Sequence, residues 1–108
     1  MKRLLTALLA AAALLAEAAA VSPVIAADRP IKIVAAEGFY GEAAKATGGD
    51  RVVVENVIVA PGTDPHDFDP PPSVAVAVAD AAVVIMNGAG YDHWMERLIE
   101  ASPDPQRV

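Results

Sequence analysis

Residues 52–72 read VVVENVIVAPGTDPHDFDPPP, an apolar, β-branched run followed by a loop rich in proline and aspartate. The run 52–59 has the composition of a buried strand. In the loop, Asp64 and Asp69 each precede a proline, which fixes its own φ at about −65° and keeps the residue before it extended. His66 is therefore expected on a braced corner, where a neutral imidazole flanked by carboxylates suits a divalent cation.

A histidine in an acidic surface loop is more often simply solvated, because a zinc site needs about four ligands and His66 supplies one. Asp64, Asp67 and Asp69 add negative charge beside the imidazole, and each of them could orient the ring as a hydrogen-bond acceptor. The loop alone leaves the solvated and the metal-binding interpretations open.

On the N-terminal side, residues 31–36 form another short β-branched run, and a turn at 37–41 leads into a helical pattern at 42–46. The Gly48-Gly49 pair ends that helix, because glycine adopts the left-handed conformation found at helix C-termini. Strand, helix and strand in this order predict a crossover unit with two parallel strands. Ligands of open parallel sheets bind beyond the C-terminal strand ends, where the proline-rich loop begins.

On the C-terminal side, residues 74–79 alternate valine and alanine, as a strand alternates large and small side chains. Ser73 is a good helix N-cap, however, and a strand here would leave no crossover, so we predict a short helix. A third strand at 82–86 and a turn at 87–90 follow, and Asp92 can cap a final helix. That helix carries an apolar stripe made of Trp94, Met95, Leu98 and Ile99. The sequence therefore predicts an α/β fold, a parallel sheet with flanking helices in the order βαβαβα.

Residues 1–27 have the layout of a secretory signal peptide, with a basic start, a Leu/Ala run from 4 to 15 and small residues before cleavage after Ala26 or Ala27. The apolar run is shorter than the roughly 20 residues that a membrane span needs. A retained N-terminal anchor is the alternative. We expect an exported chain, periplasmic or otherwise extracytoplasmic.

The composition is acidic, with a net charge of −6 over 108 residues. Losing Lys2, Arg3 and Glu17 with the signal peptide removes two positive charges and one negative charge, which leaves −7. This charge disfavours nucleic acid and anionic membrane surfaces as partners and favours cations. The sequence contains no cysteine, so no disulfide is expected within it.

Three segments resemble one family when they are taken together: KIVAAEGFYGEAAKATGGDRV at 32–52, PGTDPHDFDPPPS at 61–73 and ADAAVVIMNGAGYDHWMERL at 79–98. In this order and spacing they look like the N-terminal lobe of the zinc/manganese solute-binding proteins of ABC transporters. The resemblance implies two α/β lobes joined by a long helix, with the metal bound between them. Residues 28–108 would then be an N-terminal lobe whose C-terminal partner lobe is absent.

The resemblance also implies a site residue, because the family's first metal ligand is the histidine that matches His66. The remaining ligands would come from later in the chain. His93 stands where the family commonly has proline, so the resemblance implies that it is not a metal ligand. We expect it instead to face solvent in the first turn of a helix. Gly38 also departs from the family, which often has asparagine there.

The function that the resemblance implies is capture of Zn²⁺ or Mn²⁺ by a monomer outside the cytoplasmic membrane. The metal would be delivered to the permease and ATPase of an ABC transporter, which would be the only link to the membrane. Such a protein is not an enzyme. The alternatives are a truncated metal-buffering protein and an exported metal-dependent hydrolase with Glu37 or Asp67 as general base, although the sequence lacks His-x-His and His-Glu-x-x-His motifs.

Overall fold

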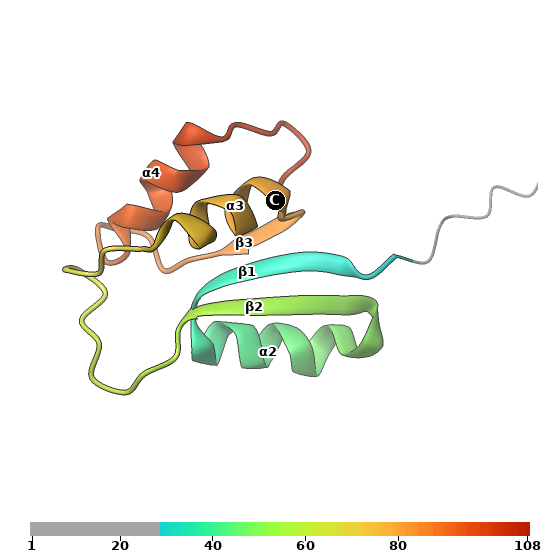
Figure 1. Ribbon diagram of the computed structural model, residues 1–108. Coiled ribbons are helices and arrows are strands. Elements are labelled where there is room, and N and C mark those ends of the chain that lie inside the picture. The colour runs from blue at the N-terminus through green and yellow to red at the C-terminus, as the bar shows by residue number, and fades with distance from the viewer. Residues whose placement is uncertain (1–28) are drawn as a thin grey trace, which may run out of the picture.

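The computed structural model describes residues 29–108, and the predicted signal peptide lies outside them (Figure 1). The elements in chain order are β1 (Ile31–Glu37), α2 (Gly38–Gly48), the 3₁₀ turn η2 (Gly49–Arg51), β2 (Val52–Ile58), α3 (Pro72–Asp80), β3 (Val83–Ile85) and α4 (His93–Ala101). The predicted order βαβαβα is confirmed. Within the described part of the chain, no helix has the length and hydropathy needed to cross a membrane.

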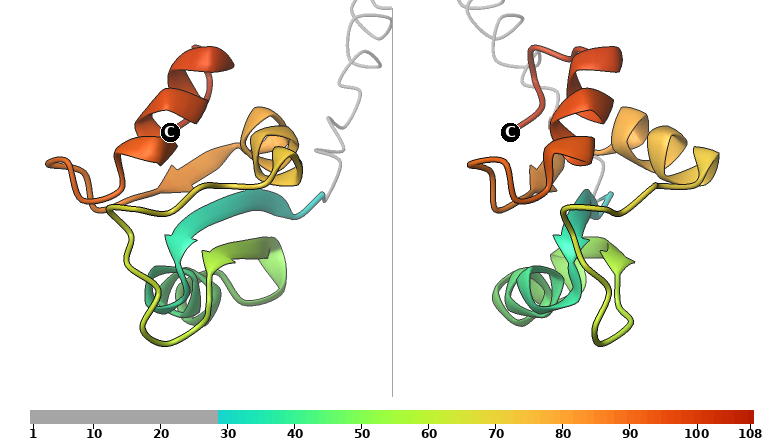
Figure 2. Two further views of the ribbon diagram at one scale, coloured as in Figure 1. Left: turned by 60° about the vertical axis from the view of Figure 1, so that its left-hand side comes forward. Right: turned by 90° about the vertical axis from the view of Figure 1, so that its left-hand side faces the viewer.

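The three strands form one parallel sheet in the order β2-β1-β3. β1 is central, because Ile33 pairs with Val54 of β2 on one side and with Val83 of β3 on the other. The helix α2 covers one face of the sheet, and α3 and α4 lie on the other (Figures 1 and 2). The fold is thus a three-layer α/β unit whose strands all end at one rim.

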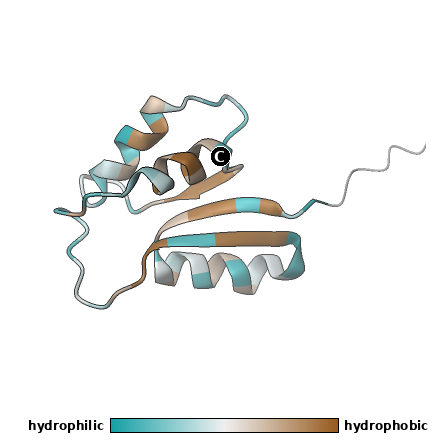
Figure 3. Ribbon diagram, in the orientation of Figure 1, coloured by the Kyte–Doolittle hydropathy of each residue, from teal (hydrophilic) through white to brown (hydrophobic). Residues whose placement is uncertain are grey.

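The main hydrophobic core lies between the sheet and the pair α3 and α4, and apolar residues concentrate in the strands and α3 (Figure 3). Val74 and Val78, four residues apart on α3, are buried, whereas Val76 between them is 64% exposed. A strand would have placed all three valines on one face, so the predicted helix is confirmed over the alternating pattern. The buried core residues of this cluster are Val34, Ala36, Ile58, Val74, Val78, Ala81, Trp94 and Met95.

The predicted turn at 37–41 is wrong, because β1 continues through Glu37 and α2 begins directly at Gly38. Gly41 permits close packing of α2 against β2 instead of a loop. A Cβ atom at Gly41 would collide with the side-chain oxygen of Asn56 on β2. The predicted helix at 42–46 is therefore longer, and Gly49 ends it with a φ of +57°.

The prediction that Ser73 is the N-cap of its helix is also wrong. The helix α3 begins at Pro72, and Pro71 occupies the cap position without a side-chain bond. Proline suits the first helical position because its missing N–H would have had no partner there. The N–H of Val74 donates to the Pro71 carbonyl at 2.9 Å.

Arg107 ties the ends of α3 and α4 together at the rim where the strands begin. Its guanidinium donates to the carbonyl of Ser102 at 2.7 Å and to the carbonyls of Ala79 and Ala81 at 3.3 Å each. Carbonyls at helix C-termini lack partners within the helix and carry partial negative charge, so a cation stabilises them.

Candidate metal site

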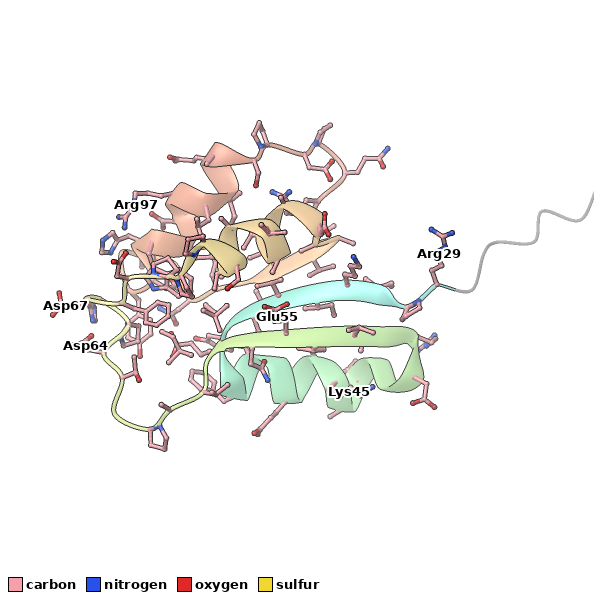
Figure 4. The ribbon with its side chains drawn as sticks, in the orientation of Figure 1. Arg29, Lys45, Glu55, Asp64, Asp67 and Arg97 are labelled. Carbon is pink, nitrogen blue, oxygen red and sulfur yellow. The ribbon has the colours of Figure 1, made fainter. Side chains whose placement is uncertain are left out.

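His66 lies at the rim where the strands end, in the loop of residues 59–71 that connects β2 to α3, hereafter the β2–α3 loop. Its ring meets the ring of Tyr91 edge-on, with centroids 5.0 Å apart and planes at 75°. Tyr91 directly follows the turn at 87–90 after β3, so two loops that are distant in sequence meet at His66. In Figure 4, the labelled Asp64 and Asp67 show how this loop projects beyond the strand ends.

Asp64 holds His66 in two ways through one carboxylate oxygen. That Oδ1 accepts the backbone N–H of His66 at 2.9 Å and lies 2.9 Å from the ring Nδ1. The backbone bond, and then the side-chain bond, lower the pKa of the Asp64 carboxyl, which favours its ionised form. An ionised carboxylate can only accept, so this bond assigns the ring proton to Nδ1 and leaves Nε2 as the basic nitrogen.

The His66 side chain is 57% exposed, so the imidazole is open to a ligand from solution. Nδ1 is bound to a carboxylate, and Nε2 forms no hydrogen bond with the described residues. Neighbouring carboxylates orient metal-binding histidines in this way. Asp67 and Asp69 are exposed, and within residues 29–108 neither forms a hydrogen bond with His66. The structure therefore selects Asp64 from the three aspartates that sequence reasoning left open.

Trp94 contacts both the backbone and a side chain of the β2–α3 loop. Its indole N–H donates to the carbonyl of Pro65 at 3.1 Å, and this bond is buried. Phe68 packs edge-on against the same indole, with centroids 5.0 Å apart. Two residues that flank His66 in sequence thus contact one buried side chain of α4, a contact that the sequence did not reveal.

Asp92 braces the turn at 87–90. It stands at the N-cap position of α4 but makes no side-chain bond to the helix, so its predicted capping role is wrong. Its fully buried carboxylate accepts the N–H groups of Asn87 at 2.7 Å and of Gly88 at 2.8 Å. Gly88, Ala89 and Gly90 have φ values of +73°, +53° and +82°, and this left-handed run brings both donors to one carboxylate.

The same rim carries further polar groups. The hydroxyl of Tyr40, in the first turn of α2, donates to the side-chain oxygen of Asn87 at 2.8 Å.

Two ionisable groups of this rim have raised pKa values. Glu37 is 5% exposed, and its burial, followed by the charge of Asp92, raises the pKa of its carboxyl. Desolvation and then the charge of Glu37 raise the pKa of Tyr91. Sequence reasoning missed both tyrosines, although their places after β1 and β3 could have indicated them.

Glu37 and Asn56 line a cavity of about 340 Å³ beside the start of the β2–α3 loop. Each has one buried side-chain oxygen without a hydrogen-bond partner in the described part of the chain. Neither Glu37 nor Asp67, the general bases of the hydrolase alternative, forms a hydrogen bond with His66 across residues 29–108. His93, exposed at the start of α4, makes no ring contact or hydrogen bond to His66 there either.

Chemically, the arrangement offers one oriented imidazole at an acidic rim. Among the described residues, no group of three or more His, Cys, Asp or Glu side chains is arranged to hold a metal ion. The rim can therefore supply a single nitrogen ligand and a favourable electrostatic environment for a cation.

The family model for zinc-uptake complex component A, periplasmic (ZnuA), matches residues 33–108. The chain belongs to the ZnuA family. The manganese-binding lipoprotein MntA of Halalkalibacterium halodurans is 38% identical over 74 residues, which is 68% of this chain and 24% of MntA. The iron-binding protein YfeA of Yersinia pestis is 30% identical over 76 residues, or 70% of this chain and 24% of YfeA. The chain thus spans about a quarter of the length of these curated relatives.

Among solved structures, the Zn(II)-bound ZnuA-like domain of Streptococcus pneumoniae AdcA superposes with a TM-score of 0.60 at 26% identity. The match covers 73% of this chain and 29% of that one. This likeness confirms the predicted α/β fold and the predicted resemblance to metal receptors of ABC transporters.

Proposed function

We propose that this protein captures a divalent transition metal, Zn²⁺ or Mn²⁺, outside the cytoplasmic membrane and passes it to an ABC transporter. The observation that carries the proposal is the exposed His66 imidazole, oriented by Asp64 at the strand-end rim of a ZnuA-family fold. Similar proteins are metal ABC transporter substrate-binding proteins rather than enzymes, and binding with release breaks no covalent bond. The metal is the cargo.

The chemistry of the proposal rests on His66 Nε2. Hydrogen bonding of Nδ1 to a carboxylate fixes the ring and makes the opposite nitrogen a better donor to the metal. One imidazole completes only part of a coordination sphere, so the other ligands come from residues beyond this rim. Nitrogen-rich ligand sets favour zinc and carboxylate-rich sets suit manganese. Similar proteins are named for manganese, iron and zinc, so the ligands that complete the site would decide which metal this protein binds.

The protein would have two lobes and would be exported from the cytoplasm. Residues 28–108 act as the N-terminal lobe of a two-lobed receptor, and residues 1–27 direct its export as a signal peptide. We propose that the receptor works as a monomer whose partner is the permease with its ATPase. The acidic composition, with a net charge of −6, supports attraction of cations.

Isothermal titration of the full-length protein with Zn²⁺ and with Mn²⁺ tests the proposal. Replacing the ligand in His66→Ala should weaken binding by at least about 100-fold, more than the loss of a residue that only orients a ligand. His93→Ala is the matched control, because this exposed histidine lies in a helix that contacts the same loop. Both side chains are exposed, so the melting temperatures should not change. Unchanged metal affinity in His66→Ala would refute the proposal.

A further inference from the structure

The β2–α3 loop has almost no hydrogen bonds to the rest of the fold. Within residues 60–70, Thr63 N–H donates to the Ala60 carbonyl at 3.3 Å, and the bonds of His66 go to Asp64, so these contacts stay inside the loop. Across the described part of the chain, one bond leaves this segment for another element, from the Trp94 indole to Pro65. That single bond ends at the carbonyl next to His66.

Trp94 is well placed to fix that carbonyl. It is 1% exposed and belongs to the main core, so its ring cannot follow a moving loop without disturbing α3 and α4. A buried indole N–H needs an acceptor, and a buried carbonyl needs a donor. Pro65 is itself buried, and proline allows little rotation around its own backbone. The peptide that leads into His66 therefore has one favourable position.

We propose that Trp94 is a positioning residue for metal capture. Its N–H fixes the backbone before His66, while Asp64 fixes the ring nitrogen and Tyr91 lies against the ring. Together these three contacts determine where Nε2 meets the metal. This inference rests on the proposed function of His66. A purely structural Trp94 would instead affect the stability of the fold and leave the metal affinity of folded molecules unchanged.

The expected effect follows from the population of the binding-competent loop. Without the bond, the loop occupies other conformations, and the apparent Kd rises by the inverse of the competent fraction. We expect about a tenfold loss of affinity, which corresponds to about 1.4 kcal/mol. That is the size expected for one buried hydrogen bond in this setting.

The test is a Zn²⁺ titration of the full-length protein with two variants of Trp94. Trp94→Phe keeps an aromatic ring, and benzothienylalanine at the same position keeps the bicyclic shape without the N–H. Val78→Ala is the control, because truncating this fully buried residue of α3 lowers stability and leaves the hydrogen bond from Trp94 to Pro65 in place. Both Trp94 variants should bind Zn²⁺ about tenfold more weakly, and Val78→Ala should bind like the wild type.

Two results would overturn the inference: wild-type affinity in the benzothienylalanine variant, or an equal loss of affinity in Val78→Ala. His66→Ala separates the two proposals, since normal binding in that variant refutes the proposed function itself. Loss of binding in His66→Ala with normal binding in the Trp94 variants refutes only the positioning role.

Discussion

Replacing Asp92 with asparagine should strongly destabilise the turn that follows β3. The carboxylate is fully buried and accepts two backbone N–H groups, at 2.7 and 2.8 Å. Hydrogen bonds to charged groups contribute about 1.5 to 3 kcal/mol each. The asparagine side chain would retain one acceptor oxygen and turn an NH₂ group toward the second N–H, so one bond is lost and a buried donor is left without a partner. We expect the free energy of unfolding to fall by about 2 to 3 kcal/mol.

Equilibrium urea unfolding measures this loss. With an m-value of about 1 kcal/mol/M for a small protein, the midpoint should fall by about 2 to 3 M. Asp80→Asn is the matched control, because the Asp80 side chain is 65% exposed and its ion pair with Lys32, at 3.5 Å, contributes little. A change for Asp92→Asn no larger than that for Asp80→Asn would refute the idea that the buried carboxylate stabilises the turn.

Three further predictions concern the same rim and α2. Glu37→Gln should stabilise the protein at neutral pH by about 1 kcal/mol. The pKa of Glu37 is raised in the folded protein, so its contribution to stability is present below pH 4.5 and is lost as the pH rises through the folded pKa. Urea unfolding should therefore show the stability difference between Glu37→Gln and the wild type disappearing in acid. Gly41→Ala should lower the melting temperature despite the better helix propensity of alanine, because the new Cβ meets the side chain opposite it on β2; a higher melting temperature would contradict this. Asp64→Asn should weaken Zn²⁺ binding about 10- to 100-fold in calorimetry, and Asp67→Asn, which lacks the contact to His66, should not.

Periodicity and loop chemistry were enough to predict the parallel α/β fold and the rim at which His66 lies. The helix α3 was predictable although its valines alternate, because a crossover between parallel strands requires an intervening element. The strand order β2-β1-β3 was not predicted, since three short apolar strands are equally good neighbours on pattern alone. The turn before α2 was predicted wrongly, because a glycine needed for close packing resembles one needed for a turn.

The contacts around the candidate site were less accessible to sequence reasoning. Asp64 was one of three equivalent aspartates, although its ability to bond the backbone two residues later could have distinguished it. The Trp94 bond joins residues 29 apart in sequence, and no local pattern reports such a contact. Asp92 has the signature of a helix cap, and only the folded turn shows that its carboxylate faces backward to Asn87 and Gly88.

Arg107 gives the two ends of this unit unequal numbers of hydrogen bonds between elements. One guanidinium holds three carbonyls at the C-terminal ends of α3 and α4. Among the described residues, segment 60–70 has one hydrogen bond to another element, from the Trp94 indole to Pro65. Local opening is easiest where the fewest protected contacts must break. Loss of the Trp94 bond should therefore release the His66 end of the unit, while the end held by Arg107 stays closed.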